Sequence, residues 1–184
     1  MIIDAGLCRI RPWESRDLER LPAIANDIGV ARYLRHRFPH PYTNEDAAVW
    51  LALVAAKPDG SRFAIEVDGV LAGGIAIEPF TQEHADVGDL GYWLGREYWG
   101  RGIATSLVRA LVRHGFETLN LRRLEAPVMA ANVASARVLE KAGFVCEATL
   151  SQYYVDREGT LHDGIMYRMI RSEYQDAIRS RKQR

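Results

Sequence analysis

The spacing of hydrophobic positions divides the chain into segments with a strand period and segments with a helix period. Strand-like runs, apolar or alternating, occur at 7–13, 63–67, 70–77, 86–94, 123–129, 144–150 and 161–169. Helix-like spacing occurs at 15–28, 43–54, 103–119 and 132–143. The resulting order, β-α-α-β-β-β-α-β-α-β-β, predicts a mixed α/β sheet.

Polar and turn-forming residues predict where these elements begin and end. Ser15 and Thr43 are expected to cap the first two helices, and Pro22 predicts a kink or two short helices in the first. The run 57–60 is expected to close the second helix. Asp68-Gly69, between two strand-like runs, is a strong signal for a hairpin turn.

The last predicted helix has a signal at each end. Asn132 is a favourable cap, and Gly143 is a favourable stop because glycine adopts the left-handed conformation that ends many helices. The final residues 179–184 are mostly basic and are expected to fray.

Composition suits one globular domain over residues 1–184. The chain is 48% hydrophobic and carries 24 basic against 24 acidic residues, so no overall field draws it to nucleic acid or lipid. No apolar run approaches the roughly 18 residues that a membrane helix needs, and the N terminus lacks the pattern of a signal peptide. We therefore expect a cytoplasmic protein without a membrane or nucleic-acid partner.

Cysteine usage gives no metal set and no disulfide framework. Cys8 and Cys146 are isolated in the sequence and stand among apolar residues. We expect each to be a reduced thiol in the core.

The stretch 89–105 carries the strongest chemical signal. A strand runs into a glycine-rich turn, Gly100-Arg101-Gly102, and then into a helix start, which can hold an anion on unpaired amide groups. No Walker run is present. A dinucleotide loop is disfavoured because Thr105 stands where its third small residue belongs.

Two segments resemble a known family. Trp99-Gly100-Arg101-Gly102-Ile103-Ala104 resembles the acyl-coenzyme A pyrophosphate loop of the GNAT N-acetyltransferases, although Trp99 replaces the usual first residue. Asn132-Val-Ala-Ser135 with Leu139-Glu-Lys-Ala-Gly-Phe144 is similar to the RimJ/RimL-like branch, which acetylates ribosomal-protein N termini. Gly91-Tyr92-Trp93 and Gly159…His162-Asp163 also look like that branch. The resemblance covers about 9–167.

The resemblance implies a fold and a reaction. The fold would be a mostly antiparallel sheet of six to seven strands with about four flanking helices, and the strands at 86–94 and 123–129 would splay into a V. Acetyl-CoA would supply the acetyl group, and a primary amine would attack it directly in a ternary complex. The preferred acceptor is a protein N terminus. Alternatives are a polyamine, an aminoglycoside or another small amine, or a non-catalytic acetyl-CoA sensor. The protein would be a monomer or a homodimer.

The resemblance also implies a cofactor site. The main-chain amides around Gly102 would bind the pyrophosphate, and the strand before the loop would run alongside pantetheine. The residues concerned are Tyr92, Trp93, Leu94, Trp99, Gly100, Arg101, Gly102, Ile103, Ala104, Thr105, Asn132 and Arg137. A solvated helix face would explain Arg137 equally well.

The chemistry of the amine limits the choice of base. Freeing an α-amino group at neutral pH costs only about 1.4 kcal/mol, whereas freeing a lysine costs roughly 4–5 kcal/mol. The resemblance makes Asp89 the candidate base, because the branch often places an acid just before Gly91-Tyr92-Trp93, and alternation would put Asp89 on the same strand face as Gly91 and Trp93. Glu78 and water are rivals, and an acid solvated at a strand edge is the plain alternative.

The resemblance also suggests which residue serves the leaving thiolate. Many family members use a tyrosine seven residues after the asparagine, but Leu139 stands there, so Ser135 is the candidate. Asn132 would hold water or pantetheine as well as capping the helix.

The acceptor mouth is expected in a proline-bounded aromatic stretch. Trp13, Phe38, His40 and Tyr42 are its candidate residues, and packing of these rings against the second helix is the alternative.

Overall fold

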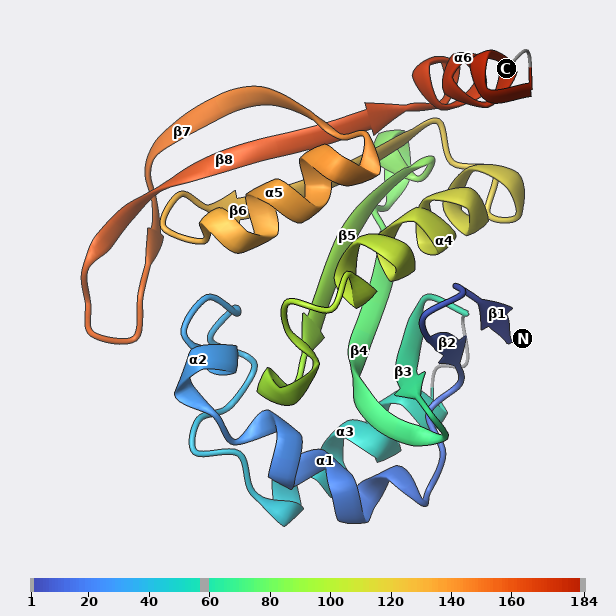
Figure 1. The fold of residues 1–184 in the computed structure, drawn as a ribbon. Coiled ribbons are helices and arrows are strands. Elements are labelled where there is room, and N and C mark those ends of the chain that lie inside the picture. Colours follow the sequence, from blue (N-terminus) through green and yellow to red (C-terminus); the bar gives the residue numbers. More distant parts are fainter. Residues whose placement is uncertain (1, 57–59, 183–184) are drawn as a thin grey trace.

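The computed structural model describes residues 2–56 and 60–182, so most of the predicted stop at 57–60 lies outside the described residues. The strands are β1 (Ile3–Asp4), β2 (Arg9–Arg11), β3 (Arg62–Val67), β4 (Val70–Pro79), β5 (Val87–Leu94), β6 (Arg123–Met129), β7 (Val145–Val155) and β8 (Leu161–Ile170). They form one eight-stranded sheet in the order β1-β2-β3-β4-β5-β6-β8-β7 (Figure 1).

The sheet confirms the predicted mixed, mostly antiparallel α/β fold. Within the described residues, only β5 and β6 pair in parallel, and every other neighbouring pair is antiparallel. The predicted number of six to seven strands was too low by one. The strand that was missed, β1, has two residues and is defined by its pairing with β2, so it leaves no period in the sequence.

Six α-helices lie among the described residues, two more than the predicted four. They are α1 (Asp17–Ala25), α2 (Ile28–Ala31), α3 (Asn44–Ala56), α4 (Ile103–Glu117), α5 (Val133–Ala142) and α6 (Arg171–Lys182). The prediction that the tail frays from residue 179 was wrong for the residues up to Lys182, because α6 continues to that residue. The sequence of α6 is polar and has no apolar stripe. The centroid of its Tyr174 ring nevertheless lies 5.0 Å from that of the Phe116 ring in α4, and this packing anchors α6.

The predicted helix ends were mostly confirmed. Pro22 lies inside α1, and the chain then forms the separate α2, whose cap Asp27 accepts a hydrogen bond from an amide at 2.6 Å. Thr43 caps α3, since its hydroxyl accepts a hydrogen bond from the Asp46 amide at 3.2 Å. Ser15 was a wrong prediction, because α1 begins two residues later without a side-chain cap.

Three other local predictions hold. Asp68 and Gly69 both have positive φ, 51° and 81°, as the tight turn between β3 and β4 requires. The Asn132 side chain accepts a hydrogen bond from the Ser135 amide at 3.2 Å and caps α5. Gly143, with φ of 103°, ends α5 in the left-handed conformation.

Two apolar layers cover the sheet. The larger one packs α4 and α5 on one face through residues such as Leu107, Leu111 and Leu139, and the smaller one packs α1 and α3 on the other through Leu21 and Ala47. Figure 1 shows α4 and α5 lying side by side over the middle of the sheet.

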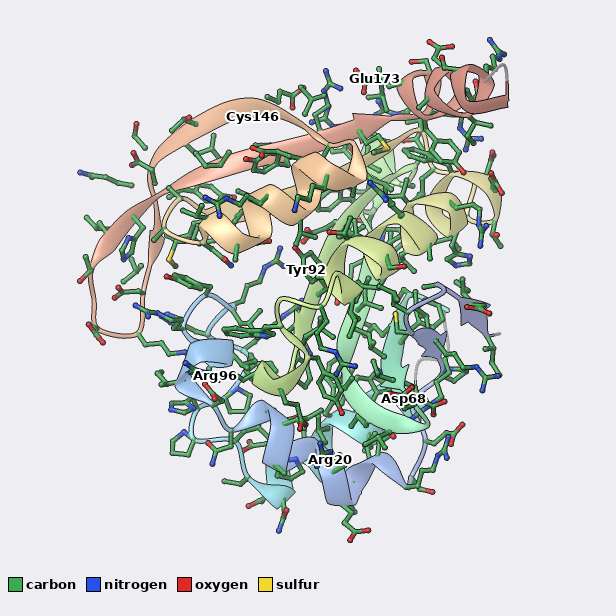
Figure 2. All side chains as sticks on the ribbon, in the orientation of Figure 1. Arg20, Asp68, Tyr92, Arg96, Cys146 and Glu173 are labelled. Carbon is green, nitrogen blue, oxygen red and sulfur yellow. The ribbon has the colours of Figure 1, made fainter. Side chains whose placement is uncertain are left out.

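The two cysteines differ in their surroundings. Cys8 is buried as expected, and burial, followed by the charge of Asp4, raises its pKa to about 11. The expectation for Cys146 was wrong, because its side chain is exposed on β7 (Figure 2). In the part of the chain that is described, no helix has the length and apolar character to cross a membrane.

The predicted splay between β5 and β6 is confirmed by their register. The two strands pair only at Val87↔Arg123, Gly88↔Leu124 and Asp89↔Glu125. Beyond Asp89, β5 stays paired with β4 while β6 stays paired with β8. The sheet therefore opens between these two strands, and the opening positions the site described next.

Candidate active site

A cavity of about 790 Å³ lies at the opening between β5 and β6. On one face of the sheet it is lined by Asn132, which caps α5, and by Ser135 and Leu139 of α5. On the other face it is lined by the segment 33–39 and by Trp50 of α3. Because both faces contribute, the cavity extends through the opening and gives two groups access to one point from opposite sides.

The start of α4 can hold an anion. Gly102 caps the helix with φ of 77°, and no described side chain makes a capping hydrogen bond there. A Cβ added at Gly100 would meet nothing within 4 Å, and one added at Gly102 would meet only Leu7 Cδ1 at 3.6 Å. The first helical amides are thus open on that side, which suits a diphosphate group.

The remaining predicted loop residues surround this helix start. Ile103 is buried, Ala104 and Thr105 are half-buried, and Arg101 is exposed with its guanidinium 5.8 Å from the Tyr98 ring. The Trp99 indole donates to the carbonyl of Leu94 at 2.8 Å, so this N–H fixes the loop onto the end of β5.

A tyrosine and a serine meet on the α5 side of the opening. The Tyr92 hydroxyl lies 2.9 Å from Ser135 Oγ, and Figure 2 shows Tyr92 near the centre of the molecule. Burial raises the pKa of Tyr92 to about 12, and the hydrogen bond with Ser135 opposes the rise only in part. The hydroxyl therefore keeps its proton near neutral pH. Leu139, which stands where many members of the resembled family have a tyrosine, is fully buried.

Sequence reasoning placed Tyr92 beside the cofactor but missed its contact with Ser135. Alternation along β5 was the available signal, because it puts Tyr92 on the face opposite Asp89. Arg137, the other predicted cofactor residue of α5, is exposed on that helix.

The predicted base Asp89 lies on the other face of the sheet, as its alternation with Gly91 and Trp93 predicts. Its carboxylate accepts a hydrogen bond from Arg35, and its side chain is only 14% exposed. Burial alone would lower the pKa of Arg35, but the charge and hydrogen bond of Asp89 raise it above its usual value. No pattern in the sequence indicates this particular pairing.

Glu78, the rival base, is directly opposite Asp89 in the β4–β5 ladder. It accepts hydrogen bonds from Arg37 at 3.1 Å and from Arg62 at 3.0 Å. Burial favours a higher pKa for this carboxyl, but the two guanidinium groups outweigh it and lower the pKa below its usual value. A carboxylate held in this way is a weaker proton acceptor than Glu78 would be alone.

Aromatic side chains line the cavity on the same side of the sheet as Asp89. Trp13, Phe38 and Tyr42 contribute to the lining as predicted, whereas His40 does not. The Phe38 ring lies 5.3 Å from the Trp93 ring and 5.2 Å from the Tyr42 ring. The result is an apolar wall beside the paired carboxylates.

The hairpin of β7 and β8 closes this side of the cavity, which sequence reasoning missed. Figure 1 shows the hairpin curving down to α2. Arg157 at its turn donates hydrogen bonds to the carbonyls of Ala31 and Phe38, so it holds the hairpin to the aromatic segment. His162 lies 2.7 Å from Asp156 and helps to shape the same turn.

Within residues 2–56 and 60–182, no group of three or more histidine, cysteine, aspartate or glutamate side chains is arranged to hold a metal ion. The open helix start, the opening in the sheet and the hydroxyl pair instead suit a long phosphorylated ligand that ends near Ser135.

Comparison with known proteins gives an independent view of the same chain. A family model for the acetyltransferase (GNAT) domain matches residues 8–145. The uncharacterized N-acetyltransferase p20 of Bacillus licheniformis is 30% identical over 172 residues, which cover 90% of this chain and 93% of that protein.

Two further similarities involve proteins with more specific names. Spermidine N(1)-acetyltransferase of Escherichia coli K12 is 27% identical over 175 residues, covering 93% of this chain and 83% of that protein. The solved structure of Mycobacterium smegmatis RimJ in complex with CoA-disulfide has a TM-score of 0.81 and 25% identity, covering 93% of this chain and 85% of that one.

Proposed function

Since this chain belongs to the GNAT acetyltransferase family and is an acetyl-CoA-dependent N-acetyltransferase, we propose that its acceptor is the α-amino group of a protein or peptide N terminus. The acceptor would be of the kind used by the RimJ/RimL-like branch, and the reaction would take place in the cytoplasm. The observation that carries this proposal is the pairing of Asp89 and Glu78, two of the three carboxylates that line the cavity, with arginines.

The proposed arrangement assigns a role to each side of the opening. The amides that begin α4 bind the diphosphate, and the edge of β5 beyond Asp89 runs alongside pantetheine. Bound acetyl-CoA supplies a thioester whose carbonyl carbon forms a bond to the amine nitrogen while its bond to sulfur breaks. The electron pair of the carbon–sulfur bond leaves with the sulfur.

The side chains then handle two protons. Asp89, or a water beside it, takes the proton that the attacking nitrogen loses. Ser135 gives a proton to the departing sulfur, and the Tyr92 hydroxyl orients Ser135 from 2.9 Å away. Asp89 and Ser135 lie on opposite faces of the sheet, which matches an amine and a thioester that approach the opening from opposite sides.

The charge around the acceptor favours an α-amine over a polyamine. A polycation binds well where carboxylates have no cationic partner, but Arg35 pairs with Asp89 and Arg37 pairs with Glu78. The third lining carboxylate, Asp46, accepts hydrogen bonds from Thr43. An α-amino group needs less help, because it reaches its neutral form near pH 8. The aromatic wall formed by Phe38 and Trp93 suits the apolar surface of a peptide.

A small-amine acceptor remains the second candidate, and the similarity to the spermidine enzyme is the observation that favours it. Purified protein should be given acetyl-CoA with a library of N-terminal peptides, with spermidine and with an aminoglycoside. Mass spectrometry of the products locates the acetyl group.

The proposal predicts that peptides are acetylated at their α-amino group at least ten times faster than any small amine is acetylated. It also predicts that Ser135→Ala loses most of this rate. Faster acetylation of spermidine would establish the second candidate. Binding of acetyl-CoA without turnover of any amine would indicate a sensor instead.

A further inference from the structure

The face of β4 and β5 that carries Glu78 and Asp89 contains a floor of small residues. Along the paired strands, the residue pairs that face the cavity are Glu78↔Asp89, Ala76↔Gly91 and Gly74↔Trp93. The middle pair, Ala76↔Gly91, therefore carries nothing larger than a methyl group. It lies between the two carboxylates of the first pair and the indole of Trp93.

Neither crowding nor backbone conformation requires glycine at position 91. A Cβ added there would meet nothing within 4 Å, and its φ is outside the left-handed region. Gly88 on the same strand differs, because an added Cβ would lie 2.6 Å from Ile77 Cγ2 and 2.8 Å from Leu121 Cδ1. Glycine inside a strand weakens it, and often marks a place where another molecule approaches the backbone.

The space above Gly91 also borders the opening in the sheet. Pairing between β5 and β6 ends at Asp89, so Gly91 lies on the part of β5 that borders the opening. Same-face neighbours along a strand are about 7 Å apart, so a group resting on Gly91 reaches both Asp89 and Trp93.

We propose that Gly91 forms the floor of a specificity subsite for the first residue of the acceptor. The α-carbon of that residue and an uncharged, apolar side chain of medium to large size, such as that of leucine or methionine, lie over Gly91. They lie against the rings of Phe38 and Trp93, with the amine directed to Asp89. This inference rests on the proposed function and adds the class of its acceptor.

Filling the floor should change the choice of acceptor. Peptides that differ only in the first residue, glycine, alanine, leucine or methionine, are compared with wild type, Gly91→Ala and Gly91→Val. Wild type should prefer leucine and methionine. Gly91→Val should lower kcat/KM for these two by at least 30-fold and for the glycine peptide by less than 3-fold. Equal losses for all peptides, or no loss for any, would overturn the proposal.

Thermal unfolding separates this role from a structural one. Gly91→Ala should unfold at the same temperature as wild type or higher, whereas Gly88→Ala should unfold at a lower temperature because of its crowded surroundings. A lower unfolding temperature for Gly91→Ala would show that the fold itself requires this glycine and would refute the inference.

Peptide binding to CoA-loaded protein, measured by calorimetry, does not depend on turnover. Gly91→Val should bind the leucine peptide at least tenfold more weakly than wild type and should bind CoA equally well. Equal affinities of the two proteins for the leucine peptide would overturn the subsite. Failure of wild type to acetylate any peptide would instead count against the proposed function, and the binding result would still decide the subsite.

Discussion

Replacing Tyr92 by phenylalanine removes one hydroxyl and leaves the ring in place. The lost contact is the 2.9 Å hydrogen bond to Ser135 Oγ. A typical intramolecular hydrogen bond adds about 0.5–1.5 kcal/mol to stability, so the unfolding temperature should fall by about 1–6 °C for a chain of this size. If the hydroxyl also orients Ser135 while the C–S bond breaks, kcat should fall about tenfold, which corresponds to about 1.4 kcal/mol.

The other kinetic constants distinguish orientation from binding. KM for acetyl-CoA should stay within about twofold of wild type, because Tyr92→Phe removes an interaction that matters after the cofactor has bound. Since the pKa of Tyr92 is raised to about 12, the hydroxyl is protonated from pH 6 to pH 9. The ratio of kcat for wild type to kcat for Tyr92→Phe should therefore be constant over that range.

Tyr167 provides a matched control. It is buried, burial raises its pKa to about 12, and its hydroxyl donates to Glu140 of α5 at 3.0 Å without lining the cavity. Tyr167→Phe should lose a similar amount of stability and leave kcat unchanged. An unchanged kcat in Tyr92→Phe, or equal effects of the two substitutions on kcat, would refute the reasoning.

Three further substitutions test other parts of the structure. Arg11→Met should cost about 3–5 kcal/mol in urea unfolding, since it removes the guanidinium that pairs with the buried Asp17 and Glu66; a loss below about 1 kcal/mol would contradict this. Asp89→Asn should lower kcat/KM at pH 7 by about 100-fold and recover partly at pH 9; an unaffected variant would exclude Asp89 as the base and leave Glu78 and water. Burial lowers the pKa of His114 in the folded protein, so the unfolded chain binds more protons below about pH 6.5 and stability falls there. Between pH 7.5 and 5.5, wild type should therefore lose more stability than His114→Gln, and equal losses would contradict the assignment.

Local patterns in the sequence were enough for most of the fold. The Asp68-Gly69 turn, the Asn132 cap and the Gly143 stop each act through neighbouring residues, so their effects appear in short segments. The two-residue β1 and the polar α6 have no such pattern. Their formation depends on strand pairing and on the packing of Tyr174, which only the folded chain brings about.

The site divides in the same way. The glycine-rich start of α4 could be recognised because its chemistry lies within a few consecutive residues. Arg35 and Asp89 are 54 positions apart, and Tyr92 and Ser135 are 43 apart, so no local pattern identifies the partner in either contact. Alternation along β5 indicates only the face on which Tyr92 lies. Ser15 failed as a cap because the Arg11–Asp17 ion pair fixes the start of α1 instead.

The most direct test is calorimetric binding of acetyl-CoA to wild type and to Gly102→Trp, which would place an indole over the open amides of α4. Gly159→Trp is the control, because Gly159 also has positive φ, 85°, and lies in the β7–β8 turn. Wild type and the control should bind with similar affinity, and Gly102→Trp should bind at least 100-fold more weakly. Folded wild type that ignores millimolar acetyl-CoA, or undiminished binding by Gly102→Trp, would contradict the account.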